Sequence, residues 1–504
     1  MIRPRALPMI ALLLSGCGLI GDSYHHIETA FPESWRNAPA PAAPEAAKAA
    51  PVWPTADWWT AFQSPPLNVL IAQAQAANFD IQAAAARVRQ ADAQARIAGA
   101  ALLPTLDATA QATHNGARGS QGSGGGKLRI ANSYNATLNA GYEVDFWGKN
   151  WAAAQAAEEL AAASRFDRET IGITITADVA TTYFAVIGAQ DRLTLARSNL
   201  ANAEALFKAI QDRFTQGIAS GLDVAQEESI VDAQRAAIPP LELALRQNID
   251  ALAILVSKMP EAADLLPAGE GLTLATIATP EVTPGLPSEL LQRRPDVQNA
   301  EAQLMAAHAN INAARAAFFP SIQLTASGGY QSPVLASLFS PTSTLFSLAA
   351  SATQPIFEGG RLSGQLEFNE ARYDELLQDY RKAVISAFSD VEDALAAVQQ
   401  DAAEEAAQRQ AAATARTAYE LTQRQLSGGI IDITTVLNTQ RTLFSAEDAL
   451  VQARLARLQA LTGLYRALGG GWQDSAPSLS PSLSPSLSPD PAPAAPPENT
   501  PAGV

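Results

Sequence analysis

The chain has 504 residues, and its 34 basic and 50 acidic side chains give a formal net charge of −16 at neutral pH. This balance disfavours nucleic-acid binding, which needs basic side chains to neutralise phosphates. The only cysteine is Cys17, so no intrachain disulfide can form.

The N-terminal residues predict a secretory signal. Arg3 and Arg5 precede a short apolar run at 6–14, so residues 1–16 are predicted to be a signal peptide. The segment Leu14-Ser15-Gly16-Cys17 resembles a bacterial lipoprotein box, which implies that Cys17 becomes an acylated N-terminus. The residue after the cysteine is Gly18 and not the Asp that would favour retention in the inner membrane. The resemblance therefore implies that the lipid anchor lies in the outer membrane. The alternative is an ordinary secretory signal with an incidental cysteine.

The chain after the signal peptide is not expected to contain a membrane-spanning helix. No later apolar run approaches the about 18–20 residues of a spanning helix, so we expect membrane contact through strands or a lipid. Residues 17–65 are rich in proline and alanine, with Trp53, Trp58, Trp59 and Phe62 near their end. We expect an extended, lipid-anchored arm that lies over the body and is pinned by these aromatic side chains.

The next segment predicts a helix followed by a long hairpin. Residues 67–103 are rich in helix formers and stop before Pro104, which predicts a helix. A hairpin is predicted at 105–146, with a Gly/Ser loop at 115–127. Its second strand alternates over its whole length, and the apolar positions are Leu128, Ile130, Tyr134, Ala136, Leu138, Ala140, Tyr142, Val144 and Phe146. Such alternation is typical of a membrane barrel strand with lipid on one face and water on the other, although a long edge strand of a soluble sandwich is the alternative.

Two long helices follow the hairpin. Residues 149–214 contain no proline, and about 65 residues at 1.5 Å each predict a helix on the order of 100 Å long. Apolar residues recur there every seven positions, as in a coiled-coil seam: Val179, Val186, Leu193, Leu200, Phe207 and Phe214. After a turn, residues 222–258 are predicted to return as a helix kinked at Pro239-Pro240, and residues 261–287 form an irregular linker.

The whole pattern then repeats. Leu103-Pro104 returns about 216 positions later as Phe319-Pro320, so repeat 1 at 66–260 is followed by repeat 2 at 288–472. Repeat 2 has a predicted hairpin at 321–357 and long helices at 361–426 and 434–468. The seven-residue spacing of its first long helix is interrupted by Glu405. The Pro/Ser/Ala tail at 473–504 is predicted to be disordered.

Four membrane strands cannot close a barrel by themselves, because the smallest single-chain membrane barrels have about eight. Open strand edges in lipid would leave backbone groups unpaired. The sequence therefore predicts that several copies share one ring.

Four motifs carry a resemblance to a known family; they lie at 142–149, 293–301, 314–320 and 354–361. Among them are Phe146-Trp147-Gly148, Arg294-Pro295-Asp296 and Phe357-Glu358-Gly359-Gly360. Over roughly residues 17–472 the chain resembles the outer-membrane efflux lipoproteins, the TolC/NodT type of outer-membrane factor in tripartite RND-type pumps. The resemblance implies a mainly α fold with membrane β, in which duplicated helix–β-hairpin–long helix–turn–helix units form a trimeric, twelve-stranded β-barrel and a periplasmic α-helical barrel.

The resemblance also implies a function. We expect a passive exit duct for drugs and small toxic compounds in the bacterial outer membrane, opened by a periplasmic adaptor and served by an inner-membrane RND-type transporter. One alternative is a duct for type I protein secretion, and another is a periplasmic structural lipoprotein without a pore. The substrates are not readable from the sequence.

Catalytic and metal motifs are not found in the sequence. The four histidines lack helical ligand spacing and no Gly-x-Ser-x-Gly elbow occurs, so we expect no enzyme activity, no metal and no cofactor.

The informative sites are the two turns between long helices, where the resemblance implies adaptor docking. The docking candidates are Gly217, Ile218, Ser220, Gly221, Gly428, Gly429 and Ile430. The candidates for a closing ring are Thr434, Asn438, Asp432 and Asp223. Asn438 stands where family members often have Asp, so Asp432, Asp223 and Glu227 are the expected sources of negative potential. The alternative roles are turn former and helix cap.

Overall fold

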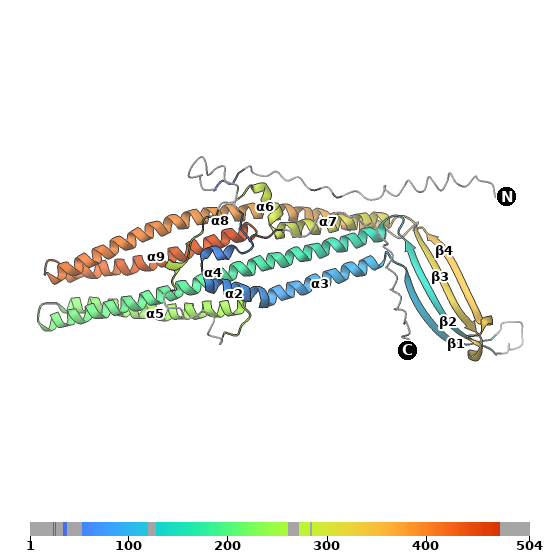
Figure 1. Cartoon of the computed structure of the whole chain (residues 1–504), viewed down its shortest axis with the longest axis horizontal. Coiled ribbons are helices and arrows are strands. Elements are labelled where there is room, and N and C mark those ends of the chain that lie inside the picture. The colour runs from blue at the N-terminus through green and yellow to red at the C-terminus, as the bar shows by residue number, and fades with distance from the viewer. Residues whose placement is uncertain are drawn as a thin grey trace, which may run out of the picture.

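The computed structural model describes residues 24, 26, 34–37, 53–118, 128–260, 272–282 and 285–473. The predictions for the signal peptide, for Cys17 and for the C-terminal tail lie outside these residues. The described chain is a long helical body with a four-stranded sheet at one end (Figure 1).

The elements occur in two matching halves. The first half contains η2 (Trp58–Phe62), α2 (Pro65–Ala77), α3 (Phe79–Ala100), β1 (Thr105–Arg118), β2 (Leu128–Val144), α4 (Lys149–Thr215) and α5 (Gly221–Leu255). The second half contains η3 (Leu274–Thr276), α6 (Pro287–Arg293), α7 (Pro295–Ala316), β3 (Ser321–Ser332), η4 (Leu335–Ser337), η5 (Pro341–Ser343), β4 (Thr344–Thr353), α8 (Arg361–Ser427) and α9 (Ile433–Ala467). The helices α4 and α8 each have 67 residues, α5 and α9 each have 35, and α3 and α7 each have 22. The two halves are therefore built to the same lengths.

The predicted helix at 67–103 is two helices, α2 and α3, separated at Asn78. The Asn78 side-chain oxygen accepts hydrogen bonds from the backbone N–H groups of Asp80 and Ile81, at 2.9 and 3.2 Å. Its amide donates to the carbonyl of Leu255 at 2.9 Å. Asn78 thus caps α3 and ties it to the end of α5, which explains why the helix stops there.

The predicted return helix is α5, which continues through Pro239 and Pro240 as one element. The helix α4 contains a window apolar and long enough to cross a membrane, contrary to the expectation from the sequence. That window is 56% buried inside the chain, as is usual for the core helix of a protein body.

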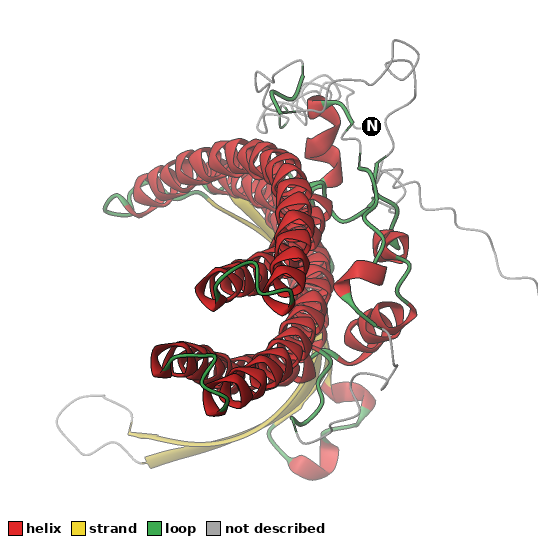
Figure 2. Cartoon of the chain, turned by 90° about the vertical axis from the view of Figure 1, so that its left-hand side faces the viewer, coloured by secondary structure: helices red, strands yellow, loops and turns green. Residues whose placement is uncertain are grey.

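The long helices lie side by side in an arc when the molecule is viewed along its length, with the short helices on the outer side (Figure 2). Aromatic and aliphatic side chains fill three clusters along this body, and the largest fully buried ones include Tyr183, Phe184, Phe62 and Tyr380. The third cluster lies near the turns and joins α4, α5, α8 and α9. Apolar side chains therefore join the helices at three levels of the arc.

The sheet is antiparallel in the order β1-β2-β3-β4. Its register pairs Ala108 with Leu138, Ala140 with Ala326, and Leu324 with Ala350, so even-numbered positions share one face across all strands. That face is apolar and includes Leu106, Ala108, Leu138, Ala140, Tyr142, Leu324, Ala326, Tyr330, Phe346, Leu348 and Ala350. The alternation predicted from β2 alone therefore extends over the whole sheet.

Candidate functional site: the helical tips, the equatorial ion pairs and the sheet face

The apolar face of the sheet remains largely uncovered. Phe346 is 84% exposed and Leu348 79% exposed, which is unusual for large apolar side chains of a water-soluble sheet. On the opposite face, the Thr109 and Thr137 hydroxyls lie 2.9 Å apart, and the Asn139 amide donates to Thr109 at 3.0 Å. The sheet therefore presents one face suited to lipid and one suited to water.

Aromatic side chains gather where the strands meet the helices. The ring of Trp147 stacks on Phe319 with centroids 4.8 Å apart, and its indole N–H donates to the carbonyl of Pro320 at 2.8 Å. Phe146 meets Trp147 edge to face at 4.8 Å. Tryptophan with its N–H satisfied is typical of the boundary between membrane and water, so this junction marks one edge of the apolar band.

The two turns at the far end of the helices have the same geometry. Gly217 and Gly429 adopt positive φ angles of 77° and 68°, which only glycine accepts without strain. The next residue in each turn donates its backbone N–H across the helix end at 2.9 Å, from Ile218 to Arg213 and from Ile430 to Gln425. Each turn therefore ends its helix with a left-handed glycine followed by an isoleucine.

Those isoleucines leave an apolar surface at the tips. Ile218 is 62% exposed and Ile430 is 75% exposed. The other exposed large apolar side chains nearby are Phe214, Leu222 and Leu421. Ser220 and Gly221 begin α5, and Gly428 ends α8. The predicted docking candidates are thus grouped at one end of the molecule.

Two of the predicted gate residues are helix caps. Ser220 and Asp223 form a reciprocal capping box at the start of α5. The Asp432 carboxylate accepts from the backbone N–H and the hydroxyl of Thr435, at 2.9 and 2.7 Å, and these bonds lower the pKa of Asp432. Both aspartates therefore organise the first turn of a helix, whatever else they do.

The other two gate candidates lie on the surface of α9. Thr434 and Asn438 are exposed and one turn apart, so they share a face of the helix. Glu227, expected as a nearby source of negative potential, is wholly buried, unlike the other two carboxylates named for this role. Its burial depends on α9, which lies more than 200 residues further along the chain and which local sequence does not reveal.

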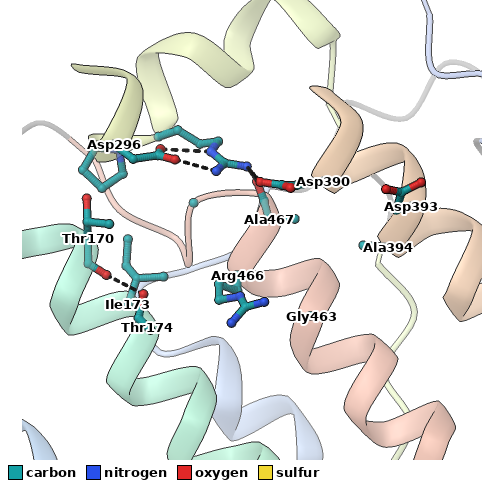
Figure 3. Close-up of a pocket in the computed structure, with 13 residues that line it drawn as sticks. Thr170, Ile173, Thr174, Asp296, Asp390, Asp393, Ala394, Gly463, Arg466 and Ala467 are labelled. Atoms are coloured by element: carbon teal, nitrogen blue, oxygen red, sulfur yellow. Dashed lines mark hydrogen bonds and ion pairs between the residues drawn. The ribbon is translucent and has the colours of Figure 1, made fainter. Parts of the chain in front are cut away.

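The arginine of the Arg-Pro-Asp motif forms ion pairs and hydrogen bonds that connect several helices near the middle of the body. Arg294 is ion-paired to Asp296 at 2.5 Å and to Asp390 at 2.9 Å, beside a cavity of about 370 Å³ (Figure 3). Arg294 also donates to the carbonyls of Ala387 and Ala467, at 3.4 and 3.3 Å. Burial lowers the pKa of Arg294, but the two carboxylates outweigh it and raise the pKa further. One guanidinium thus joins α7, α8 and the end of α9.

A second buried charge cluster was not foreseen as a cluster. Glu405 is buried and ion-paired to Arg409, to Arg454 at 3.0 Å and to Arg457 at 2.7 Å. Arg454 also donates to the carbonyls of Leu274, Ala275 and Ile277, at 2.6, 3.1 and 3.3 Å. The only sequence signal was the interruption of the seven-residue spacing by this glutamate.

The N-terminal arm binds along the second half of the body. The indole of Trp35 donates to the carbonyl of Gly285 at 2.7 Å, and the Glu392 carboxylate accepts from the backbone N–H groups of Arg36 and Asn37 at 2.6 and 3.0 Å. Trp58 stacks on Tyr465 with centroids 4.7 Å apart. Within the described residues, aromatic side chains and the carboxylates of Glu392, Glu289 and Glu301 hold the arm.

The described residues contain no candidate metal site. No group of three or more His, Cys, Asp or Glu side chains could hold an ion there. His26 bonds Glu301 at 2.5 Å, and His114 bonds Asn132 at 2.5 Å. Both histidines thus have structural partners.

Comparison with known proteins gives a consistent result. The family described as "Outer membrane efflux protein" matches residues 70–256 and 286–470, one range in each half of the chain. The chain is 42% identical over 427 residues to the pyoverdine export outer membrane protein OpmQ of Pseudomonas aeruginosa, covering 84% of this chain and 89% of OpmQ. It is 34% identical over 471 residues to the toluene efflux pump outer membrane protein TtgC of Pseudomonas putida, covering 93% and 96%.

The fold has solved counterparts. The open state of the MtrE outer membrane channel of Neisseria gonorrhoeae matches with a TM-score of 0.80 at 31% identity, covering 90% of this chain and 98% of MtrE. A membrane protein of Pseudomonas aeruginosa matches with a TM-score of 0.81 at 31% identity, covering 89% and 100%. These matches confirm the TolC-like fold predicted from the sequence.

Proposed function

Because the chain belongs to the outer membrane efflux protein family and is an outer-membrane channel of the efflux type, we propose that three copies close one twelve-stranded barrel. The lumen would continue through a periplasmic tube of helices. Solutes would pass through this duct passively, and partner proteins would supply the driving force. The Cys17 lipid would anchor the chain in the outer membrane.

One observation carries the proposal: the sheet has two chemically different faces and two edges. Its strands β1 and β4 are the outermost of four, and each has one side unpaired in the described chain. Unpaired backbone groups are not tolerated in lipid, and four strands are too few to close. Pairing β4 of one copy with β1 of the next satisfies both edges and turns the hydroxyl and amide face inward. The long helices lie in an arc (Figure 2), and in the proposed trimer this arc would extend the barrel wall into the periplasm.

The tips are the proposed docking surface for a periplasmic adaptor, itself attached to an inner-membrane RND-type transporter. The matched turns of α4–α5 and α8–α9 place Ile218 and Ile430 in solvent beside glycines that hold a fixed backbone shape. Exposed apolar side chains on a rigid turn favour binding to a partner protein. Both docking surfaces are present in each chain, so an adaptor would meet repeated copies of one motif.

The closing ring is proposed at the first turns of α9 and α5. Thr434 and Asn438 lie on one exposed face of α9, and Asp432 and Asp223 cap the two helices beside it. Since Asn438 is uncharged, the two capping aspartates supply the negative charge at this level. The named relatives export pyoverdine and toluene, and we propose small molecules as the cargo class of this chain as well.

The experiment is the native mass of the detergent-solubilised protein, followed by its conductance in planar bilayers. The chain has a mass of 52.9 kDa, so three copies without their signal peptides should give about 150 kDa plus bound lipid and detergent. Discrete conductance steps should follow when the trimer is reconstituted. A stable folded monomer, or a trimer without any conductance, would overturn the duct.

A further inference from the structure

Glu227 is the feature of the helical body that the proposed duct leaves unexplained. It lies on α5, close to the tip, with an exposed fraction of 0%. Neither carboxylate oxygen has a hydrogen-bond partner among the described residues. Gln440 of α9 is equally buried, and neither polar atom of its side chain has a partner there either. Two polar groups are therefore buried beside each other, and neither meets hydrogen-bond geometry with a partner.

Glu227 lies one helical turn before Ile230 and Val231, which belong to the apolar cluster near the tips. Four helices supply this cluster, and its apolar members include Ala203, Leu206, Phe207 and Ile210 of α4, Ile230 and Val231 of α5, Ala415 of α8, and Val436, Leu437 and Phe444 of α9. The titratable or charged groups that act on Glu227 are Tyr419 of α8 and Arg441 of α9. Arg441 is exposed, so water screens much of its charge. Glu227 has no close, buried counter-charge.

Burial raises the pKa of Glu227 to about 7, although Arg441 and the Gln440 amide lower it. An ionised carboxylate without hydrogen bonds is costly in an apolar interior, whereas the neutral acid is tolerated. Because of where Glu227 lies, the cost of ionising it bears on the contact between two helical hairpins. Glu227 belongs to the α4–α5 hairpin and Gln440 to the α8–α9 hairpin, so the pair lies on the seam between the two hairpins near their tips.

We propose that Glu227 is a proton-binding site of the closed helical tube, and that loss of its proton helps the two hairpins of each chain to separate. In the closed state the carboxyl is buried and protonated against Gln440. When the hairpins separate, the carboxylate meets water and can ionise freely. The link to channel opening rests on the proposed duct, whereas the pH-dependent separation of the two hairpins does not depend on it.

The size of the effect follows from linkage. If the pKa changes from about 7 in the closed seam to 4.5 in water, the equilibrium constant for seam opening rises about tenfold between pH 6 and pH 8. The sign follows from the raised pKa in the closed state. Stabilisation of the closed seam by the neutral acid is complete at low pH, is lost as the pH rises toward 7, and changes little above it.

Hydrogen exchange of the full-length trimer tests this inference directly. Protection factors of the α5 and α9 amides around Glu227 and Gln440 should fall about tenfold from pH 6 to pH 8 in the natural protein. Glu227→Gln, which keeps the shape of the neutral acid, should hold them constant. The matched control is Glu228→Gln, since Glu228 is the exposed neighbour on the same helix. Replacing Gln440 with leucine removes a group that favours ionisation, so the transition should move to higher pH.

Conductance separates the two proposals. If the protein conducts, its open probability should rise with pH in the natural protein and in Glu228→Gln but not in Glu227→Gln. Equal pH dependence of protection in all three proteins would overturn the proton-binding site while leaving the duct intact. A Glu227-dependent change in protection without any conductance would support the site and refute the duct.

Discussion

The charge of the buried Glu405 carboxylate is expected to stabilise the folded body. Its carboxylate binds three arginines, and it lies on the packed seam of α8 at the position where an apolar residue is expected. Burial raises the pKa of Glu405, but the hydrogen bond from Arg457 and the charges of Arg454, Arg457 and Arg409 outweigh burial and leave the pKa below its usual value. Glu405→Gln keeps the shape and removes the charge.

The cost of this substitution can be worked from the contacts. Removing one partner of a buried ion pair typically costs about 3–5 kcal/mol, because the other charge is left uncompensated. Here Arg454 keeps three carbonyl acceptors and Arg409 is mostly in water, so only Arg457 is left poorly paired. We therefore expect a loss of about 2–3 kcal/mol in the free energy of unfolding, which corresponds to a fall of about 2–3 °C in melting temperature for a chain of this size.

Thermal unfolding of the detergent-solubilised protein, followed by circular dichroism, measures the loss. Glu404→Gln is the matched control, since Glu404 is the exposed neighbour on the same helix. Because the pKa of Glu405 is depressed in the folded state, its contribution is present at neutral pH and is lost as the pH falls through that pKa. The gap between Glu405→Gln and the natural protein should therefore close in acid. Equal melting of the two Gln variants at pH 7 would refute the reasoning.

Three further outcomes are expected. Asp432→Ala removes both a cap and a charge at the proposed closing ring, so it should raise single-channel conductance, and Asp432→Asn, which can still cap, should reproduce the effect only if the charge matters; unchanged conductance in both would exclude a gating role. Ile218→Asp should weaken adaptor binding at least tenfold in a pull-down or titration, while Thr215→Asp adds the same charge at the same tip and should not; equal losses would point to charge rather than the apolar contact. Leu138→Arg places a charge on the lipid face of β2 at a cost of about 2–4 kcal/mol and should reduce the yield of folded trimer, whereas Thr137→Arg faces the lumen and should fold; indifference to both would speak against a membrane sheet.

The fold was largely predictable because its signals are local and long. The alternation in β2 needs only one strand to appear, and the seven-residue spacing in α4 places Val179 and Val186 in the core, where both are wholly buried. The same spacing fails at Phe214, which is 49% exposed because it lies at the tip, where the helices end. The break at Asn78 was missed because an alanine-rich stretch on both sides hides a capping residue.

The candidate site was less predictable because its chemistry is not local. The glycines of the two turns were visible in the sequence, since a left-handed residue after a helix requires them. The burial of Glu227 against α9, and the pairing of Glu405 with Arg454 and Arg457 of α9, depend on helices that meet only after the chain has folded. A charged residue at a seam position is nevertheless a usable signal, because it must be either exposed or paired.

The Glu405 cluster also determines how much of α8 extends beyond its ion pairs toward the tip. It binds α8, α9 and the η3 segment together at one level of the body, while α8 continues to Ser427 without another such anchor to η3. At 1.5 Å per residue, the distance from Glu405 to the end of α8 is about 33 Å. A rotation of about 10° at the cluster would therefore move the tip sideways by about 6 Å, roughly the diameter of two water molecules. Small rotations of α8 at this level thus produce large displacements at the tip.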